Sequence, residues 1–156
     1  MRAMSEAAGI YTRESDYLDR CVQVGVAGDR VLSVSFPASL AADADHEHPL
    51  LDRLFEYLAG APDEFDDIEL ALTVPTDQRA VLDAVRELAY GEQTTVERLT
   101  RQIPTLDADA DDDRDHVRTA LDENPIPILI PDHRVRDGPS AAPPKVEQKL
   151  RSLEGL

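Results

Sequence analysis

At residues 124–134 the chain reads Asn124-Pro125-Ile126-Pro127-Ile128-Leu129-Ile130-Pro131-Asp132-His133-Arg134. The apolar run Ile128–Ile130 is long enough only for a short buried strand, and Pro127 and Pro131 stop that strand at both ends. Three polar, titratable residues follow at once. A buried strand that ends in such groups can hold them rigidly at the floor of a pocket. A core strand followed by a solvated loop is the alternative interpretation.

Extended to Val135, this stretch resembles the active-site signature of the methylated-DNA–protein-cysteine methyltransferases, the O6-alkylguanine-DNA alkyltransferases, at eleven of its twelve positions. The position that differs holds the alkyl-accepting cysteine in that family, and here it is Asp132. The alkyltransferase-like branch of the family carries a tryptophan there, so neither branch is matched. A looser similarity extends from about Ala71 to Glu154. The resemblance implies a helix-turn-helix that enters the minor groove of DNA and flips out the damaged base.

The resemblance also implies roles for single residues. In the family a histidine and an arginine follow the cysteine, and a glutamate of the last helix orients the histidine. The matching residues are His133, Arg134 and Glu154. Asn124 matches the asparagine that joins the recognition helix to the active-site strand, and Pro131 belongs to the same pocket. These residues position the reacting group and do not themselves accept the alkyl group.

The positions that carry the family's chemistry and DNA contacts differ. Asp132 is a hard carboxylate where the reaction needs a thiolate, and a carboxylate is a far poorer nucleophile at saturated carbon. The base-extruding arginine of the family falls on Asp115, and its phosphate-contacting tyrosine falls on Val96. We therefore expect any DNA binding to be weak and to depend on the nearby cations Arg114 or Arg118.

The chain is strongly acidic, with a net charge of −16 and a pI of about 4.4. Aspartate supplies 20 of its 32 acids, and only two of its 16 basic residues are lysine. This balance resembles proteins of salt-accumulating halophiles, whose acidic surfaces stay hydrated in concentrated salt. At low salt such a molecule repels nucleic acid, but in molar salt the screening length is roughly 3 Å and local contacts decide. The acidic run 106–115 is accordingly interpreted as a solvated loop.

Composition also limits where the protein is expected to be located and which cofactors it is expected to bind. No apolar run approaches the roughly 20 residues of a membrane helix, and the first residues lack the apolar segment of a signal peptide. We expect a cytoplasmic monomer that does not bind membranes. The single cysteine, Cys21, excludes an internal disulfide and a multi-cysteine metal site. His46 and His48 lie in an acidic loop without implied geometry, so no metal and no other cofactor are expected.

In the N-terminal half, apolar residues recur both at the spacing of a strand and at the spacing of a helix. Apolar residues alternate over 22–26 and again over 32–36, with a glycine between them, which predicts a two-stranded hairpin. A helix with one apolar face is expected over 49–60. Alternation over 68–72 predicts a third strand, whereas residues 1–20 show little periodicity.

The C-terminal half is predicted to be helical, with apolar residues at helical spacing over 81–89, 96–99, 117–121 and 146–153. Thr94 and Glu97 form a capping box that should open the second helix. Three helices before the apolar stretch is the order of a winged helix-turn-helix. The predicted fold class is therefore α/β, with a small mixed N-terminal domain, 1–72, and a helical, winged-helix-like alkyltransferase domain, 73–156.

Three functions are compatible with these observations. The first is a non-catalytic sensor that binds duplex DNA containing O6-alkylguanine and recruits another repair protein. The second is an enzyme with a re-purposed pocket, in which Asp132, His133 and Glu154 act as an acid–base set. The third is a degenerate module that binds a protein or a small molecule and no DNA. Because the residues of the pocket frame persist, the sequence favours the first.

Overall fold

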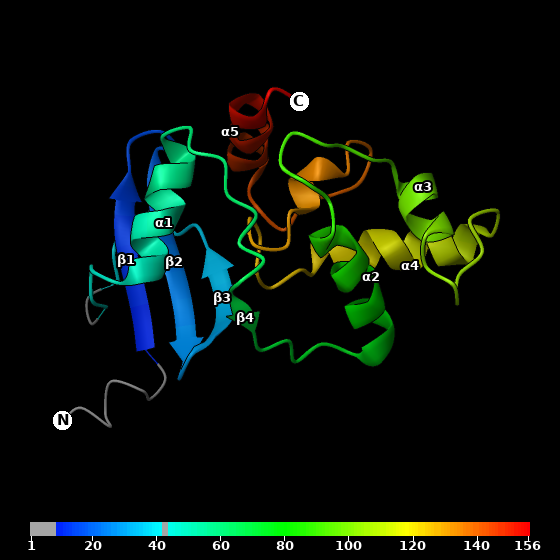
Figure 1. Ribbon diagram of the computed structural model, residues 1–156, viewed down its shortest axis with the longest axis horizontal. Helices are drawn as coiled ribbons and strands as arrows, with labels where there is room; N and C mark the ends of the chain where they lie inside the picture. The colour runs from blue at the N-terminus through cyan, green and yellow to red at the C-terminus, as the bar shows by residue number, and fades with distance from the viewer. Residues whose placement is uncertain (1–8, 42–43) are drawn as a thin grey trace.

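The computed structural model describes residues 9–41 and 44–156 of the chain. Its N-terminal half is a four-stranded sheet covered by one helix, and its C-terminal half is helical. Figure 1 shows the sheet and α1 at one side, α2, α3 and α4 at the other, and α5 above the region between them. The predicted α/β class is confirmed. None of the helices in the described ranges is long and apolar enough to cross a membrane.

The sheet has the order β1-β2-β3-β4, formed by Gly9–Ser15, Arg20–Ala27, Arg30–Ser35 and Glu69–Leu70. The first three strands are antiparallel, and β4 pairs in parallel with β3. The predicted hairpin is β2–β3, and its turn uses Gly28 at a φ of 59°. The sequence prediction missed β1, whose buried residues are Thr12 and Ser15. Because these buried residues are polar and three apart, the strand lacks the apolar alternation on which a strand prediction depends.

Helix α1, Pro49–Leu58, confirms the helix predicted over 49–60. His48 caps it, since its Nδ1 accepts the Leu50 backbone N–H at 3.0 Å. Figure 1 shows α1 across β1 and β2, against which it buries Leu51, Leu54 and other apolar residues. The predicted third strand is shorter than expected, because β4 has only two residues.

The helical half contains α2 (Thr76–Arg86), α3 (Val96–Arg101), α4 (Asp111–Asp122) and α5 (Pro144–Glu154). All four predicted helices are present. The predicted capping box is wrong, because Thr95 caps α3 by accepting the Arg98 N–H at 3.2 Å. Thr94 instead exchanges backbone hydrogen bonds with Arg134 and Arg136, at 2.8 and 3.0 Å. A tertiary contact with a distant segment has displaced the helix start by one residue.

The predicted strand Ile128–Ile130 is wrong in conformation and right in burial. Leu129 and Ile130 are each 1% exposed, but the run forms a tight turn closed by the Ile130 N–H bond to Ile126 O at 2.9 Å. Ile128 has a φ of 76°. The neighbouring prolines cannot donate to a ladder, and no β-strand follows α4 in the described part of the chain. The helix-turn-helix order is present there without a strand that could form a wing.

The two halves are joined by one contiguous apolar core that includes residues of both the sheet and the helices. Val34 of β3 donates its backbone N–H to Pro125 O at 3.0 Å across the junction. The division at residues 72 and 73 falls between β4 and α2 and stays a prediction.

Candidate functional site

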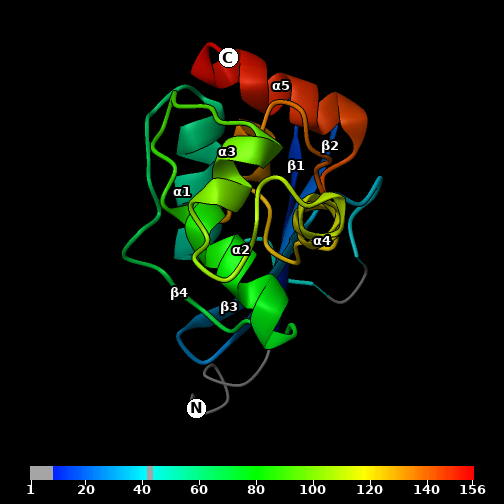
Figure 2. The same ribbon diagram turned by 90° about the vertical axis from the view of Figure 1, so that its right-hand side faces the viewer.

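The candidate site is a single 3-10 turn, η2 (Asp132–Arg134), that links the apolar turn to the segment before α5. Figure 2 shows it beneath α5. Asp132, His133 and Arg134 are only 0%, 1% and 3% exposed. The alternative of a core strand followed by a solvated loop is therefore wrong, because the polar residues are as buried as the apolar ones. Buried charges need partners, and each of the three has a different set.

Glu154 in the last turn of α5 is the centre of the site. Its carboxylate accepts hydrogen bonds from Arg134 Nε at 2.8 Å, Arg134 Nη2 at 3.1 Å, His133 Nε2 at 2.7 Å, the Gly91 N–H at 3.0 Å and the Tyr57 hydroxyl. The predicted pairing of His133 with Glu154 is confirmed. Burial alone would raise the pKa of Glu154, but the donors from His133, Arg134 and Tyr57 hold that pKa well below its usual range.

Tyr57 of α1 is the member of the site that the sequence interpretation missed. Its hydroxyl donates to Glu154 and lies 3.4 Å from His133 Nε2. Burial raises the pKa of Tyr57, and the neighbouring Glu154 charge raises it further. One signal was available in the sequence: Tyr57 lies three residues after Leu54 on the apolar face of its helix. A buried tyrosine hydroxyl requires a partner, although the sequence does not identify that partner.

Asp132 has a separate set of donors. Its carboxylate accepts from Ser140 Oγ at 2.5 Å, from the Ala141 N–H at 3.0 Å and from Asn124 Nδ2 at 3.0 Å. Burial raises the pKa of Asp132, and these three hydrogen bonds offset part of that effect. Asn124 is itself held, since its Nδ2 also donates to Ile130 O at 3.0 Å. The predicted pocket residue Asn124 therefore fixes the position of Asp132.

The segment Gly138–Ala142, here called the strap, passes over Asp132. Two of the three donors to the Asp132 carboxylate come from the strap. A Cβ at Gly138 would lie 2.8 Å from Leu121 and 3.2 Å from Val96, so the start of the strap presses against the helical core. The strap thus leaves the side chain of Asp132 with no path to solvent.

The proposed acid–base set is only partly assembled. His133 Nε2 is joined to Glu154, while His133 Nδ1 is buried without a hydrogen-bond partner among the described residues. No hydrogen bond in the described ranges connects the Asp132 carboxylate to His133. The Asp132 carboxylate instead accepts hydrogen bonds from the strap. The Asp132–His133–Glu154 relay that a re-purposed enzyme would need is therefore not formed. Pro131 is buried and directly precedes η2, at its N-cap position.

The predicted DNA-contacting positions lie on α3 and α4. Val96, the first residue of α3, is 1% exposed, and its N–H is capped by Asp137 Oδ1 at 2.8 Å. It therefore offers no surface to a phosphate. On α4, Asp115 and Arg118 form an exposed ion pair at 2.9 Å. Arg114 donates to Ala108 O at 2.5 Å.

Arg114 is also paired with an acid, Asp111, one turn earlier on the same helix. The structure thus brings Arg114, Arg118 and Asp115 together on α4, but each arginine there has a carboxylate partner. Both cations are partly neutralised within the helix, so a phosphate would have to displace Asp111 or Asp115.

Cys21 belongs to the sheet and not to the elements that form the site. It lies on β2, is 1% exposed, and pairs across the sheet with Glu14. Burial raises the pKa of the Cys21 thiol, and the charge of Glu14 raises it further. The expectation that its thiolate form is disfavoured is confirmed, and the only thiol of the chain cannot act at η2.

Two relatives with assigned names match the chain in sequence. The methylated-DNA–protein-cysteine methyltransferase of Methanopyrus kandleri is 32% identical over 112 residues, which are 69% of this chain and 78% of that protein. The methylated-DNA–protein-cysteine methyltransferase of Metallosphaera sedula is 31% identical over 110 residues, 68% of this chain and 66% of that protein. No model of a protein family matches the chain.

Solved structures share the fold at lower identity. Mycobacterium tuberculosis O6-methylguanine methyltransferase has a TM-score of 0.73 and 21% identity, covering 95% of this chain and 91% of that one. The M. tuberculosis OGT in complex with DNA has a TM-score of 0.71 and 23% identity over the same shares. The Pyrococcus kodakaraensis O6-methylguanine-DNA methyltransferase has a TM-score of 0.67 and 19% identity, covering 94% and 99%. By sequence, the chain belongs to the methylated-DNA–protein-cysteine methyltransferase family.

Proposed function

We propose that this family member has no methyl-accepting cysteine, that Asp132 occupies the acceptor position, and that the protein is a non-catalytic sensor of alkylated DNA. One observation carries the proposal. The Asp132 side chain has no exposed surface, and both of its oxygens already accept hydrogen bonds from Asn124, Ser140 and Ala141. A group held in this way maintains the shape of the site and does not react.

The chemistry of alkyl transfer supports the same conclusion. The acceptor must direct a lone pair at a saturated carbon, and a soft thiolate does this far better than a carboxylate. The carboxylate oxygens of Asp132 are directed at donors of the strap and of Asn124. Cys21, the one thiol, is buried in β2. No other side chain of the site is a nucleophile of the required kind.

The DNA-binding part of the proposal rests on what is retained. The buried arrangement of His133, Arg134, Glu154 and Asn124 keeps the frame that the family resemblance predicts. One solved protein of the same fold is an OGT in complex with DNA. A sensor without chemistry would signal by recruiting another repair protein, and it would do so as a monomer in the cytoplasm, in salt high enough to screen the charge of −16.

A second candidate, a module that binds a protein or a small molecule and no DNA, is favoured by α4. The cations of α4 are paired with acids, Asp115 stands where the family resemblance predicts the base-extruding arginine, and Val96 of α3 is buried. The re-purposed enzyme has less support, because Asp132 and His133 are not connected.

A binding experiment in molar salt tests the proposal. A duplex with one O6-methylguanine and the same duplex with guanine are titrated with the protein, and fluorescence anisotropy reports binding. The sensor should prefer the methylated duplex. Equal affinity for both duplexes would contradict lesion sensing, and the absence of binding to either would favour the second candidate.

A further inference from the structure

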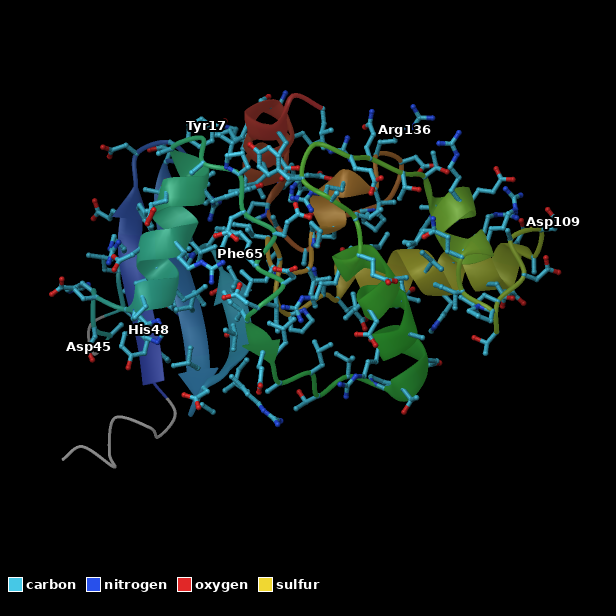
Figure 3. The ribbon with its side chains drawn as sticks, viewed as in Figure 1. Tyr17, Asp45, His48, Phe65, Asp109 and Arg136 are labelled. Carbon is cyan, nitrogen blue, oxygen red and sulfur yellow. The ribbon has the colours of Figure 1, made fainter. Side chains whose placement is uncertain are left out.

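The helical half carries a group of arginines that the DNA assignment to α4 does not use. We call Arg98, Arg101 and Arg136 the α3 edge. Arg136 is brought to the start of α3 by its backbone N–H bond to Thr94 O at 3.0 Å, and Arg98 is the third residue of that helix. All three arginines are exposed. Figure 3 shows Arg136 at one edge of the molecule, with further nitrogen-ended side chains along the same edge over α3.

The α3 edge differs from α4 in its free charge. No ion pair in the described part of the chain involves Arg98 or Arg136, whereas Arg101 pairs with Glu97 at 2.9 Å. Of the acids next to them in the sequence, Glu97 pairs with Arg101, and Asp137 has one carboxylate oxygen engaged by the Val96 N–H. Figure 3 places Asp109, in the acidic loop before α4, at a different corner from Arg136. In a chain of net charge −16, these two arginines are therefore free to bind an external anion.

We propose that Arg98 and Arg136 contact backbone phosphates of duplex DNA, so that the α3 edge, and not the arginines of α4, makes the main electrostatic contact. This inference rests on the proposed function and adds the surface that would perform it. A guanidinium donates two parallel hydrogen bonds to a phosphate, and an exposed arginine without a partner does so without first breaking an ion pair.

The place of the α3 edge in the fold fits this role. Arg136 is two residues after Arg134, the end of η2, and the Thr94 backbone bonds both of these residues. A phosphate held by Arg136 would thus lie beside the segment that carries Asp132. Phosphate contacts set the register of a duplex on a protein, whereas contacts to bases carry the selectivity. The edge would position the duplex beside the segment that carries η2.

The test uses the full chain with Arg98→Gln, Arg136→Gln and the double variant, with Arg79→Gln as the matched control. Arg79 is also exposed and forms no described ion pair, and it lies near the start of α2, which is at the bottom of Figure 1, whereas α3 is near the top. Affinity for both duplexes is measured across a salt series. Each edge variant should weaken binding about tenfold and reduce the salt slope by about 0.9, the value for one phosphate that is no longer neutralised. Arg79→Gln should change neither quantity.

The outcomes separate this inference from the proposed function. If the wild type binds DNA and the edge variants bind as tightly as Arg79→Gln, the α3 edge is not the contact surface and this inference alone is overturned. If the variants weaken binding equally to methylated and unmodified duplexes, and the wild type does not distinguish the two, the inference stands and the sensor proposal fails. No binding by the wild type would overturn both. Thermal unfolding of each variant checks that the fold is retained.

Discussion

Tyr57 in α1 and Glu154 in α5 are 97 residues apart in the sequence, and the Tyr57 hydroxyl donates a hydrogen bond to the Glu154 carboxylate. This contact ties the helix that covers the sheet to the last helix of the chain. It adds a donor to the same carboxylate that holds His133 and Arg134. Glu154 therefore connects the two halves of the protein as well as the parts of the site. Removing Glu154 or its donors should lower the free energy of unfolding.

Glu154→Gln should destabilise the protein by about 3–5 kcal/mol, the usual cost of breaking a buried ion pair from one side. The variant leaves the guanidinium of Arg134 buried, with only 4% of its side chain exposed and no anionic partner. The free energy of unfolding is measured with denaturant in molar salt. The matched control is Glu147→Gln on the same helix, because the Glu147–Arg151 pair is partly exposed and should contribute about 1 kcal/mol or less. Equal losses in the two variants would refute the central role of Glu154.

Tyr57→Phe removes only the hydroxyl that donates to Glu154. A hydrogen bond to a buried charge contributes about 1.5–3 kcal/mol, and the variant should lose stability in that range. Tyr17→Phe is the control: the Tyr17 hydroxyl also joins distant segments, to Lys149 O at 2.8 Å, but Tyr17 is 38% exposed and water can replace the bond. A Tyr57→Phe protein as stable as Tyr17→Phe would show that the contact contributes little.

Asp132→Asn should stabilise the protein at neutral pH. The amide oxygen can accept from Asn124 and Ala141, as the carboxylate does, and the amide NH2 can donate to Ser140 Oγ, so two hydrogen bonds are preserved and the third is reversed in direction, all with a neutral group.

The pH dependence follows from the raised pKa of Asp132, whose cause is burial. A carboxyl with a raised pKa in the folded state contributes stability that is fully present below the unfolded pKa of about 3.9 and is lost as pH rises through the folded pKa. The asparagine variant should therefore match the wild type in acid and exceed it at neutral pH. Unfolding free energies of both proteins across this pH range provide the check, and a less stable variant at pH 7 would contradict the prediction.

The wild-type protein should gain no methyl group from O6-methylguanine DNA, and Asp132→Cys should gain one only slowly. The new thiol would lie next to His133, whose Nδ1 has no described partner, but the strap would still cover it. Incubation in molar salt followed by intact-mass measurement tests both proteins, with Asp132→Ala as the control without a nucleophile. Stoichiometric methylation of the wild-type chain would show that it is an enzyme after all.

Asp115→Arg should strengthen DNA binding. The substitution removes the carboxylate that pairs with Arg118 and adds a second cation one turn before it on α4. The salt dependence of binding should steepen by about 0.9 for each additional phosphate that the variant neutralises. Asp29→Arg, in the exposed β2–β3 turn, changes the net charge by the same amount and is the control. If the two variants bind equally, the increase in affinity reflects total charge and α4 does not face the DNA.

The amino-acid sequence by itself determined the elements whose signals are local. The β2–β3 hairpin, α1 and the four later helices followed from apolar periods and turn residues, because burial of one face imposes these periods on the chain. The pairing of His133 with Glu154 was predicted from the family signature around them. The hairpin and the helices depend on short segments, so single stretches of sequence were enough to predict them, whereas the pairing of residues 21 apart needed the resemblance.

The tertiary structure alone decided how these parts meet. It replaced the predicted strand at Ile128–Ile130 with a buried turn, placed Tyr57 against Glu154, and closed the strap over Asp132. Each of these results depends on partners far apart in the sequence, and a residue's pattern does not show which distant donor will satisfy a buried polar group. The family resemblance aligns Asp132 with the acceptor cysteine, but the burial of Asp132 beneath the strap and its hydrogen bonds to Ser140 and Ala141 became evident only in three dimensions.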